Sequence, residues 1–216
     1  MLVILALLLA SILGPLATRL EAGERQRAQD ELSEIKESIY GFVLTNGRLP
    51  CPDTDPVPDG DENRDGAGAC VRPDGTLPWR VLEAPAQDPW GNPYAYRVTL
   101  IFADNPPSGT SGTCTTAAAQ SSFNLCDTGN IDVNDASGAL LATVPAVVFS
   151  AGKNENDPAL TVGGALSVHE AENADGDTTF ISKTFSRDVA QEFDDVVLWI
   201  SPNVLKNRMV VGGRLP

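Results

Sequence analysis

The chain has 216 residues, of which 29 are Asp or Glu and 15 are Lys or Arg, so its formal net charge is −14. That balance argues against nucleic acid as a partner, because affinity for polyphosphates comes mainly from cationic contacts. The hydrophobic fraction of 42% is enough for a core, and the length allows one ordinary domain in addition to a leading helix.

The first 46 residues are predicted to form one helix with three successive surfaces. Residues 1–18 carry no charged side chain, and residues 19–31 are strongly polar and are expected to be solvated. The third section has apolar residues at helical spacing, namely Leu32, Ile35, Ile39, Phe42 and Val43. Such a stripe indicates a helix face that packs on a core. We therefore divide the chain into a helix, residues 1–46, and a globular domain, residues 47–216.

The apolar start of this helix is just too short for a full membrane span. Eighteen residues cover roughly 27 Å, against a hydrocarbon core of about 30 Å. No basic residue precedes Leu2 and no A-x-A site follows, which argues against a cleavable signal peptide. The side chains expected to face lipid, or to be buried among copies of the same helix, are Leu5, Leu8, Leu9, Ile12 and Pro15.

Two stretches carry a resemblance to the type IV pilin-like family, which includes the pseudopilins of type II secretion. LVILALLLASILGPLATRLE, residues 2–21, resembles the later part of the family's apolar helix, with Pro15 in the place of its proline. DPWGNPY, residues 88–94, is similar to a string in the major pseudopilins that leads into the sheet.

The resemblance implies an α+β fold, in which a long N-terminal helix packs on a small antiparallel sheet domain with long disulfide-tied loops. It also implies a structural subunit of a type IV pilus or a secretion pseudopilus. Its partners would be copies of itself or related pilin-like subunits, and the inner membrane. The protein would be a single-pass inner-membrane protein with a periplasmic domain, or part of an extracellular filament.

The family's processing motif is missing from the sequence as it stands. Family members begin with a basic leader, a cleavage-site glycine, a phenylalanine that becomes methylated, and a nearby glutamate. None of these precedes Leu2. We expect either that the true start lies upstream of Met1 or that the chain has been trimmed.

Four cysteines, Cys51, Cys70, Cys114 and Cys126, lie in loop-like sequence. They form no C-x-x-C pair, and His169 is the only histidine, so the spacing of a zinc site is absent. An even number of loop cysteines behind an apolar N-terminus indicates two disulfides in an oxidising compartment. The local pairings are Cys51–Cys70 and Cys114–Cys126, although four cysteines allow three connectivities.

Calcium is the candidate cofactor, at either of two acidic segments. Asp61, Asn63 and Asp65 match the first half of a calcium loop, but Arg72 stands where a bidentate glutamate is expected. The second segment is an acidic loop, residues 154–177. It includes Glu170, Glu172, Asn173, Asp175 and Asp177, and it resembles the calcium-binding loop of major pseudopilins, although its ligand positions do not match that loop one by one. We take Glu172, Asp175 and Asp177 as its candidate ligands.

The remaining elements follow from local pattern. We predict strands at residues 94–102, 144–150 and 196–200, and loop at residues 103–143. A short helix is expected after Ser201-Pro202, with Leu205, Met209 and Val210 facing inward, and Gly212-Gly213 ending it.

No pattern supports an enzyme, since the chain has no G-x-S-x-G elbow and no H-E-x-x-H. The sequence therefore favours a pilin-like structural subunit. The first rival is a monomeric membrane-tethered periplasmic binding domain that depends on calcium. The second is an exported hydrolase with a signal anchor, which would require a concave cluster of carboxylates in the folded domain.

Overall fold

The computed structural model describes residues 2–104, 120–154, 166–188 and 191–215, and for residues 2–18 the backbone alone. The elements are α1 (Leu2–Asn46), β1 (Asp74–Thr76), α2 (Trp79–Leu82), β2 (Ala95–Val98), a 3-10 turn η1 (Leu100–Phe102), β3 (Ile131–Asn134), β4 (Leu140–Val144), β5 (Ala146–Ser150), α3 (Val168–Ala174), β6 (Thr179–Ile181), β7 (Val196–Ile200) and α4 (Pro202–Val211).

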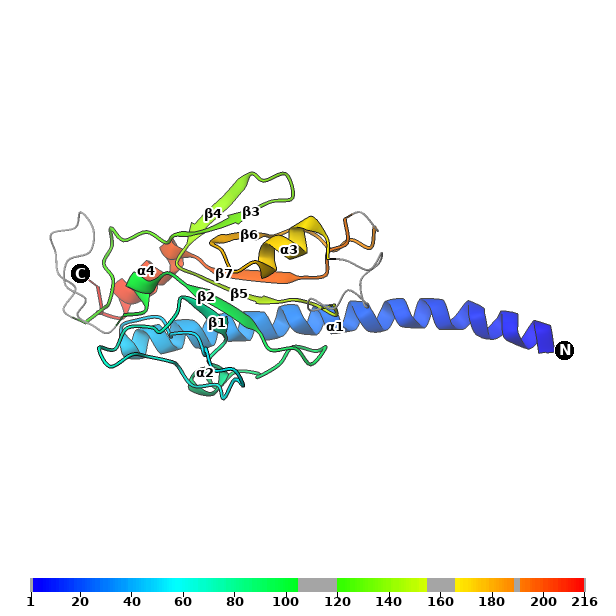
Figure 1. The fold of residues 1–216 in the computed structure, drawn as a ribbon, viewed down its shortest axis with the longest axis horizontal. Coiled ribbons are helices and arrows are strands. Elements are labelled where there is room, and N and C mark those ends of the chain that lie inside the picture. Colours follow the sequence, from blue (N-terminus) through cyan, green and yellow to red (C-terminus); the bar gives the residue numbers. More distant parts are fainter. Residues whose placement is uncertain (1, 105–119, 155–165, 189–190, 216) are drawn as a thin grey trace.

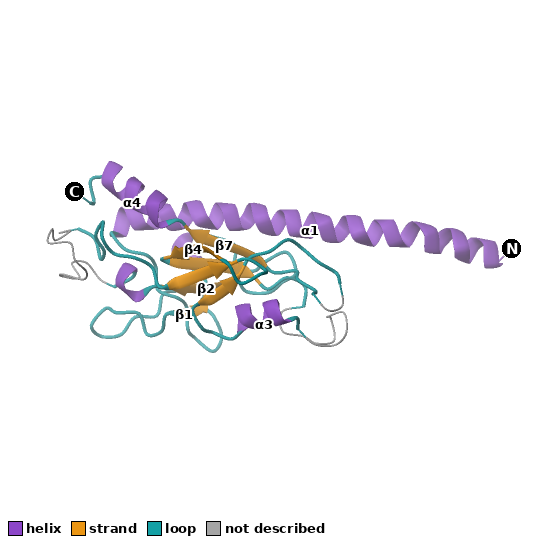
Figure 2. Ribbon diagram, turned by 90° about the horizontal axis from the view of Figure 1, so that it is seen from above, coloured by secondary structure: helices purple, strands orange, loops and turns teal. Residues whose placement is uncertain are grey.

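The strands form two sheets in separate layers. The larger sheet is antiparallel with the order β1-β2-β5-β7, and the smaller has the order β4-β3-β6, with β3 and β6 parallel. Helix α1 packs on one face of the larger sheet, and the smaller sheet packs on the other face (Figures 1 and 2). The predicted combination of an N-terminal helix and an antiparallel sheet is therefore confirmed.

The stripe on α1 makes the main contact with the sheet. Leu32, Ile35, Ile39 and Val43 are fully buried in one core with residues of β2, β5 and β7, while Phe42 is half-buried at its margin. The helix ends at Asn46 as predicted, because Gly47 adopts a left-handed conformation (φ 73°). The N-terminal part of α1 projects past the domain (Figure 1).

The polar section of α1 is less solvated than the sequence predicted. Ala28 is fully buried, and the Tyr94 hydroxyl donates to Glu31 Oε2 at 2.7 Å. The Arg25 guanidinium lies 3.7 Å from the centroid of the Phe185 ring. These three α1 residues continue the buried stripe at helical spacing. The expectation failed because only Ala28 is apolar, and a small residue gives a weak hydrophobic signal.

Three expectations for the middle of the chain were wrong. Residues 103–143 contain strands β3 and β4, because Ile131 and Val133 alternate with polar residues and bury their side chains. The strand predicted at 94–102 ends at Val98 and is followed by η1. The acidic segment 154–177 contains α3, which begins with a capping box between Ser167 and Glu170.

The C-terminal elements agree better with the sequence. All five residues of β5 are buried, since layers cover both faces of that strand. Strand β7 has the predicted bounds, and α4 begins at Pro202 and ends before Gly212. Leu205 and Met209 are buried as expected, but Val210 is 40% exposed, because it lies 100° around the helix from Met209.

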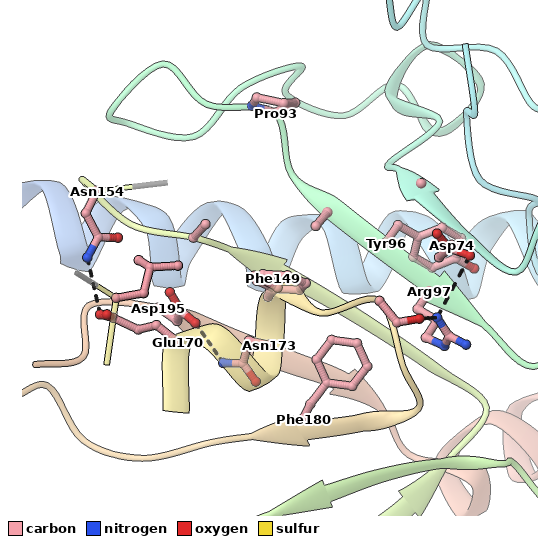
Figure 3. A pocket seen from close by; sticks show the side chains of 16 residues that line it. Asp74, Pro93, Tyr96, Arg97, Phe149, Asn154, Glu170, Asn173, Phe180 and Asp195 are labelled. Carbon is pink, nitrogen blue, oxygen red and sulfur yellow. Dashed lines mark hydrogen bonds and ion pairs between the residues drawn. The ribbon is translucent and has the colours of Figure 1, made fainter. Parts of the chain in front are cut away.

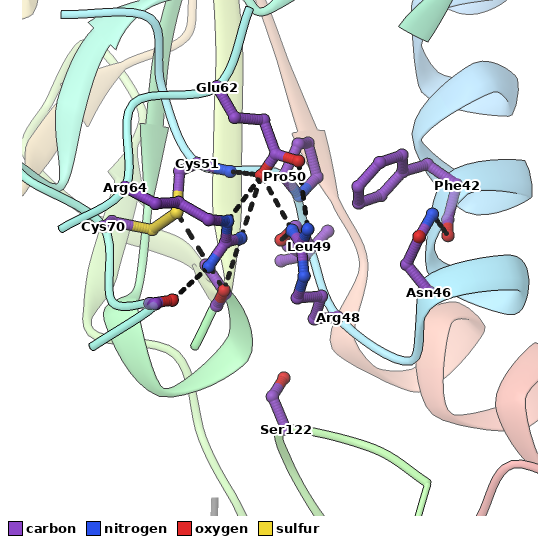
Figure 4. A network of polar contacts seen from close by, with 12 residues as sticks. Phe42, Asn46, Arg48, Leu49, Pro50, Cys51, Glu62, Arg64, Cys70 and Ser122 are labelled. Atoms are coloured by element: carbon purple, nitrogen blue, oxygen red, sulfur yellow. Dashed lines mark hydrogen bonds and ion pairs between the residues drawn. A yellow bond between two sulfur atoms is a disulfide. The ribbon is translucent and has the colours of Figure 1, made fainter. Parts of the chain in front are cut away.

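A charged cluster and a disulfide join the end of α1 to the following loop (Figure 4). The Glu62 carboxylate accepts hydrogen bonds from Arg48 at 2.7 and 3.1 Å, from Arg64 at 2.8 and 3.1 Å, and from the Cys51 amide at 2.8 Å. Burial alone would raise the pKa of Glu62, but these hydrogen bonds and the two guanidinium charges outweigh it and lower the pKa.

The predicted Cys51–Cys70 disulfide is present, with its Cα atoms 5.3 Å apart. Cys126 is also disulfide-bonded. Its expected pairing with Cys114 lies outside the described residues.

We expect Glu62→Gln to lower the free energy of unfolding by about 2–4 kcal/mol, because it leaves two largely buried guanidinium groups, with side chains 13% and 15% exposed, without their counter-ion. Chemical denaturation of the full chain at neutral pH, with disulfides intact, measures this. Glu37→Gln is the matched control. It removes the partner of Arg208 in an exposed pair and should cost less than about 1 kcal/mol. Equal losses for the two variants would contradict the expectation.

Candidate functional site

A cavity of about 230 Å³ lies between the larger sheet and α3 (Figure 3). Phe149 on β5 and Phe180 on β6 form part of its apolar wall. Glu170 and Asp195 line one region of it, and Arg97 lies in another, where it donates to the Gly176 carbonyl at 2.8 Å. The buried acids are the unusual feature, because carboxylates are rarely buried without a cationic partner.

Glu170 is held in place by the start of α3. It is the third residue of the helix, and its Oε2 accepts from the Ser167 amide at 3.1 Å while Ser167 Oγ accepts from the Glu170 amide at 3.3 Å. Its Oε1 accepts from the Asp194 amide at 3.1 Å and from Asn154 Nδ2 at 3.4 Å. Both oxygens of this buried carboxylate therefore face fixed N–H donors.

Asp194 is packed against the turn that follows β5. Its Oδ2 accepts from the Lys153 amide at 2.9 Å, while its Oδ1 is buried and has no hydrogen-bond partner in the described part of the chain. Gly152 makes the contact possible. Its φ is 68°, and a Cβ there would lie 2.4 Å from the Asp194 carboxyl carbon. A glycine is thus required both by the backbone and by the space.

Asp195 is buried like Glu170, with only 6% of its surface exposed. Its Oδ2 accepts from Asn173 Nδ2 at 2.7 Å, and Asn173 in turn accepts from the Ile181 amide at 2.7 Å. Burial raises the pKa of Asp195 well above its usual range, and the charges of Glu170 and Asp194 raise it further.

Asp194 shows the same effect, since burial raises its pKa to about 6. The nearby charges of Glu170 and Glu192 also raise it, whereas the Lys153 amide and Arg25 lower it. The charges of Arg25 and Lys183 act on Asp194 and Asp195, but neither cation forms an ion pair with these acids among the described residues. The negative charge at the site is therefore only partly compensated.

Glu170, Asp194 and Asp195 each offer a carboxylate oxygen within 4.8 Å of the others. Together with the unpartnered Oδ1 of Asp194, these oxygens are the donor set that a hard cation such as Ca²⁺ prefers. The sequence places Glu170 in the acidic segment 154–177 but does not bring it together with Asp194 and Asp195, because 24 residues separate Glu170 from Asp194. The available signal was the pair Asp194-Asp195 directly before an apolar strand, which placed acids where burial was expected.

The DPWGNPY corner supports the same turn. Asp88 Oδ1 accepts from the amides of Trp90 and Asn92 at 3.0 and 2.9 Å, and its Oδ2 accepts from Ser150 Oγ at 2.5 Å. Asn92 Nδ2 donates to the Gly152 carbonyl at 2.7 Å. The corner thus fixes the end of β5 and, through Gly152, the position of Asp194.

Of the two sets of calcium ligands that the sequence suggested, the structure brings only one together. Glu172, Asp175 and Asp177 do come together, with oxygens within 4.8 Å, at the exposed end of α3. Two of these carboxylates already accept hydrogen bonds in ordinary turns. Asp175 Oδ1 bonds to the Asp177 amide at 2.9 Å, and Asp177 Oδ1 to the Thr179 amide at 2.6 Å.

The three residues that matched a calcium loop, Asp61, Asn63 and Asp65, each contact a different partner in the structure. Asp61 pairs with Arg80 at 2.7 Å, Asn63 Oδ1 accepts from the Thr54 amide, and Asp65 Oδ1 accepts from amides of its own turn. A neighbouring acidic group, formed by Asp53, Asp55 and Asp59, is gathered instead. Asp53 in this group bonds to the amides of Asp55 and Gly60 at 3.0 and 2.7 Å.

The residues proposed for assembly, Leu5, Leu8, Leu9, Ile12 and Pro15, lie within α1, where the structure describes the backbone only. Within the residues that were described in full, no helix combines the length and the apolar character needed to cross a bilayer.

Comparisons of the chain with protein-family models, with curated proteins and with solved structures found no significant match. The interpretation of the site therefore rests on the residues of this chain.

We expect the free energy of unfolding, measured in EDTA, to rise as the pH falls from about 7.5 to about 5. Asp194 binds its proton in the folded state near pH 6, whereas an unfolded aspartate does so near pH 4, so the folded state binds more protons in this range. Asp194→Asn keeps an acceptor for the Lys153 amide and should flatten the profile. A slope that is unchanged in this variant would contradict the assignment.

We also expect Ca²⁺ to raise the melting temperature of the wild-type protein, because binding to the folded state alone is stabilising. Asp195→Asn should be more stable than the wild type in EDTA, since it removes a carboxyl group whose ionisation is opposed by burial and by two neighbouring carboxylates. The same variant should lose most of the response to Ca²⁺. Asp175→Asn, in the exposed group, is the matched control and should keep the response. The reverse pattern would place the cation at Glu172, Asp175 and Asp177.

Proposed function

We propose that this chain is a pilin-like structural subunit of a type IV pilus or a type II secretion pseudopilus. Residues 1–18 of α1 would anchor it in the inner membrane and then pack against the same helix of neighbouring subunits. Residues 47–216 would lie outside the bilayer. Assembly, in which apolar helix surface becomes buried on other copies, would be its mechanism.

The arrangement of α1 is the observation that carries this proposal. From Ala28 to Val43 the helix is held on the sheet by fully buried side chains. Before residue 19 it continues as a regular helix beyond the domain (Figure 2), through a stretch without a single charged residue. An apolar helix that its own domain does not cover needs lipid or other protein around it.

The calcium-dependent tethered domain is the second candidate, and the Glu170–Asp194–Asp195 group favours it. A bound cation would stabilise the turn after β5 and the start of β7 whether or not the chain assembles. Calcium binding is compatible with both functions, so assembly is the property that separates them.

The cavity next to these acids does not favour a hydrolase. Both oxygens of Glu170 accept hydrogen bonds from N–H groups of the fold, so this carboxylate holds the turn and the start of α3 in place. The cavity of about 230 Å³ is also below the range of roughly 300–1,000 Å³ that is usual for ligand pockets.

Cysteine cross-linking in membranes tests the proposal. The double variant Leu5→Cys/Ile12→Cys places two thiols on one face of α1, seven residues apart. In a filament these thiols meet different neighbours, so oxidation should give a ladder of covalent multimers. Val57→Cys/Val168→Cys, at positions 82% and 81% exposed on the domain, is the two-thiol control and should give no ladder. Monomers alone from the helix variant would support the tethered domain.

A further inference from the structure

A groove of about 500 Å³ opens beside β7. Val197, Leu198 and Trp199 of β7 line it, together with Tyr40 on α1 and Val204 on α4. Strand β7 is the last strand of its sheet, and no other described strand pairs with its outer edge. The groove is therefore an apolar surface beside an open sheet edge.

Two cations and one acid, Lys36, Arg208 and Glu37, line this groove. The resulting net positive charge stands out in a chain of net charge −14. Arg208 is already engaged, since it donates to Glu37 at 2.7 and 3.0 Å and lies over the Tyr40 ring at 4.2 Å. Lys36 lines the same groove and forms no ion pair with any described residue. It is thus available to an acidic partner.

The β3–β4 hairpin carries exposed apolar side chains and acidic side chains, which complement the groove beside β7. Leu140 and Leu141 on β4 are 59% and 51% exposed. In the register of the pair, Asn134 lies opposite Leu140 and Val133 lies opposite Ala142, so Leu141 is an extra residue on β4. Such a bulge redirects side chains out of the regular sheet alternation and makes direct pairing along that edge unfavourable.

The charge of the hairpin is negative. Asp132 lies on β3 and Asp135 in the turn, and no Lys or Arg occurs between residues 98 and 152. Two exposed leucines beside acidic residues thus form a surface that matches an apolar groove with a free lysine at its rim.

We propose that the β3–β4 hairpin of one copy docks in the groove beside β7 of a neighbouring copy. Leu140 and Leu141 fill the groove, and the hairpin carboxylates face Lys36. This inference rests on the proposed function, because it names a contact between domains in the assembly. The two surfaces are different parts of the chain, so the contact is head-to-tail and continues from copy to copy instead of closing as a pair.

The test uses the full chain in membranes, with two differently tagged copies. One copy carries Val204→Cys at the groove, and the other carries Leu141→Cys or, as a second probe, Leu140→Cys. All three positions are more than 40% exposed, so the substitutions should not disturb folding. We expect oxidation to give a mixed covalent dimer that contains both tags. Dimers of like variants only, or no mixed dimer with either leucine position, would overturn the proposal.

A charge reversal tests the role of Lys36. Lys36→Glu, introduced into the groove copy, should lower the yield of the mixed dimer. Arg72→Glu makes the same change of charge at an exposed residue that pairs with Asp74, outside the groove, and should leave the yield unchanged. Equal yields from the two variants would overturn the assignment of Lys36 to this contact.

The helix variant Leu5→Cys/Ile12→Cys separates this inference from the proposed function. A ladder from the helix thiols without the mixed dimer would overturn the hairpin contact and leave filament assembly standing. The mixed dimer without a ladder would support the hairpin contact and overturn assembly through the helix.

Discussion

The structure depends on the burial of one helix stripe against one sheet. Leu32, Ile35, Ile39 and Val43 meet residues of β2, β5 and β7, and each is completely removed from water. Burying an aliphatic side chain of this size contributes roughly 1.5–3 kcal/mol. Because α1 lies across several strands, this contact also sets the position of the apolar N-terminal part of the helix relative to the domain. Any role for residues 1–18 in a membrane or a filament is exerted through this contact.

On the other face of the larger sheet, polar groups are buried and are held in place by hydrogen bonds. The corner at residues 88–94 holds the turn after β5, and Gly152 in that turn admits the Asp194 carboxylate. Glu170 then binds the Asp194 amide from the start of α3. As a result, Asp194 and Asp195 have raised pKa values, and Oδ1 of Asp194 is buried without a hydrogen-bond partner in the described part of the chain. Such an arrangement is unfavourable in the absence of a cation. In contrast, Glu62 sits between two arginines, and its charge is fully compensated.

These two faces leave distinct surfaces for association. The sheet ends at β7 with an open edge, next to a groove that α1 and α4 complete. The smaller sheet presents its two leucines at the β4 bulge, on the layer farther from α1. A head-to-tail contact between these surfaces would link domains while the helices pack among themselves. Assembly would then use two separate contacts, one apolar and continuous along the helix, the other local and sensitive to salt.

The sequence alone determined those features that depend on residues close together in the chain. Residues close together in the chain predict the periodicity of α1, the turn at Gly47, strand β7 and the proline at the start of α4. They also offer Cys51–Cys70 as a local disulfide, but the structure selects that pairing among the three possible connectivities. Only the tertiary structure decided the rest. It buried Ala28 and half-buried Arg25, and it formed two strands of the second sheet from a segment that appeared loop-like by composition. It also brought Glu170 to Asp194 and Asp195. Spacing along the chain sets local geometry. Which distant segments lie close together depends on how the layers pack, and local sequence patterns do not predict it.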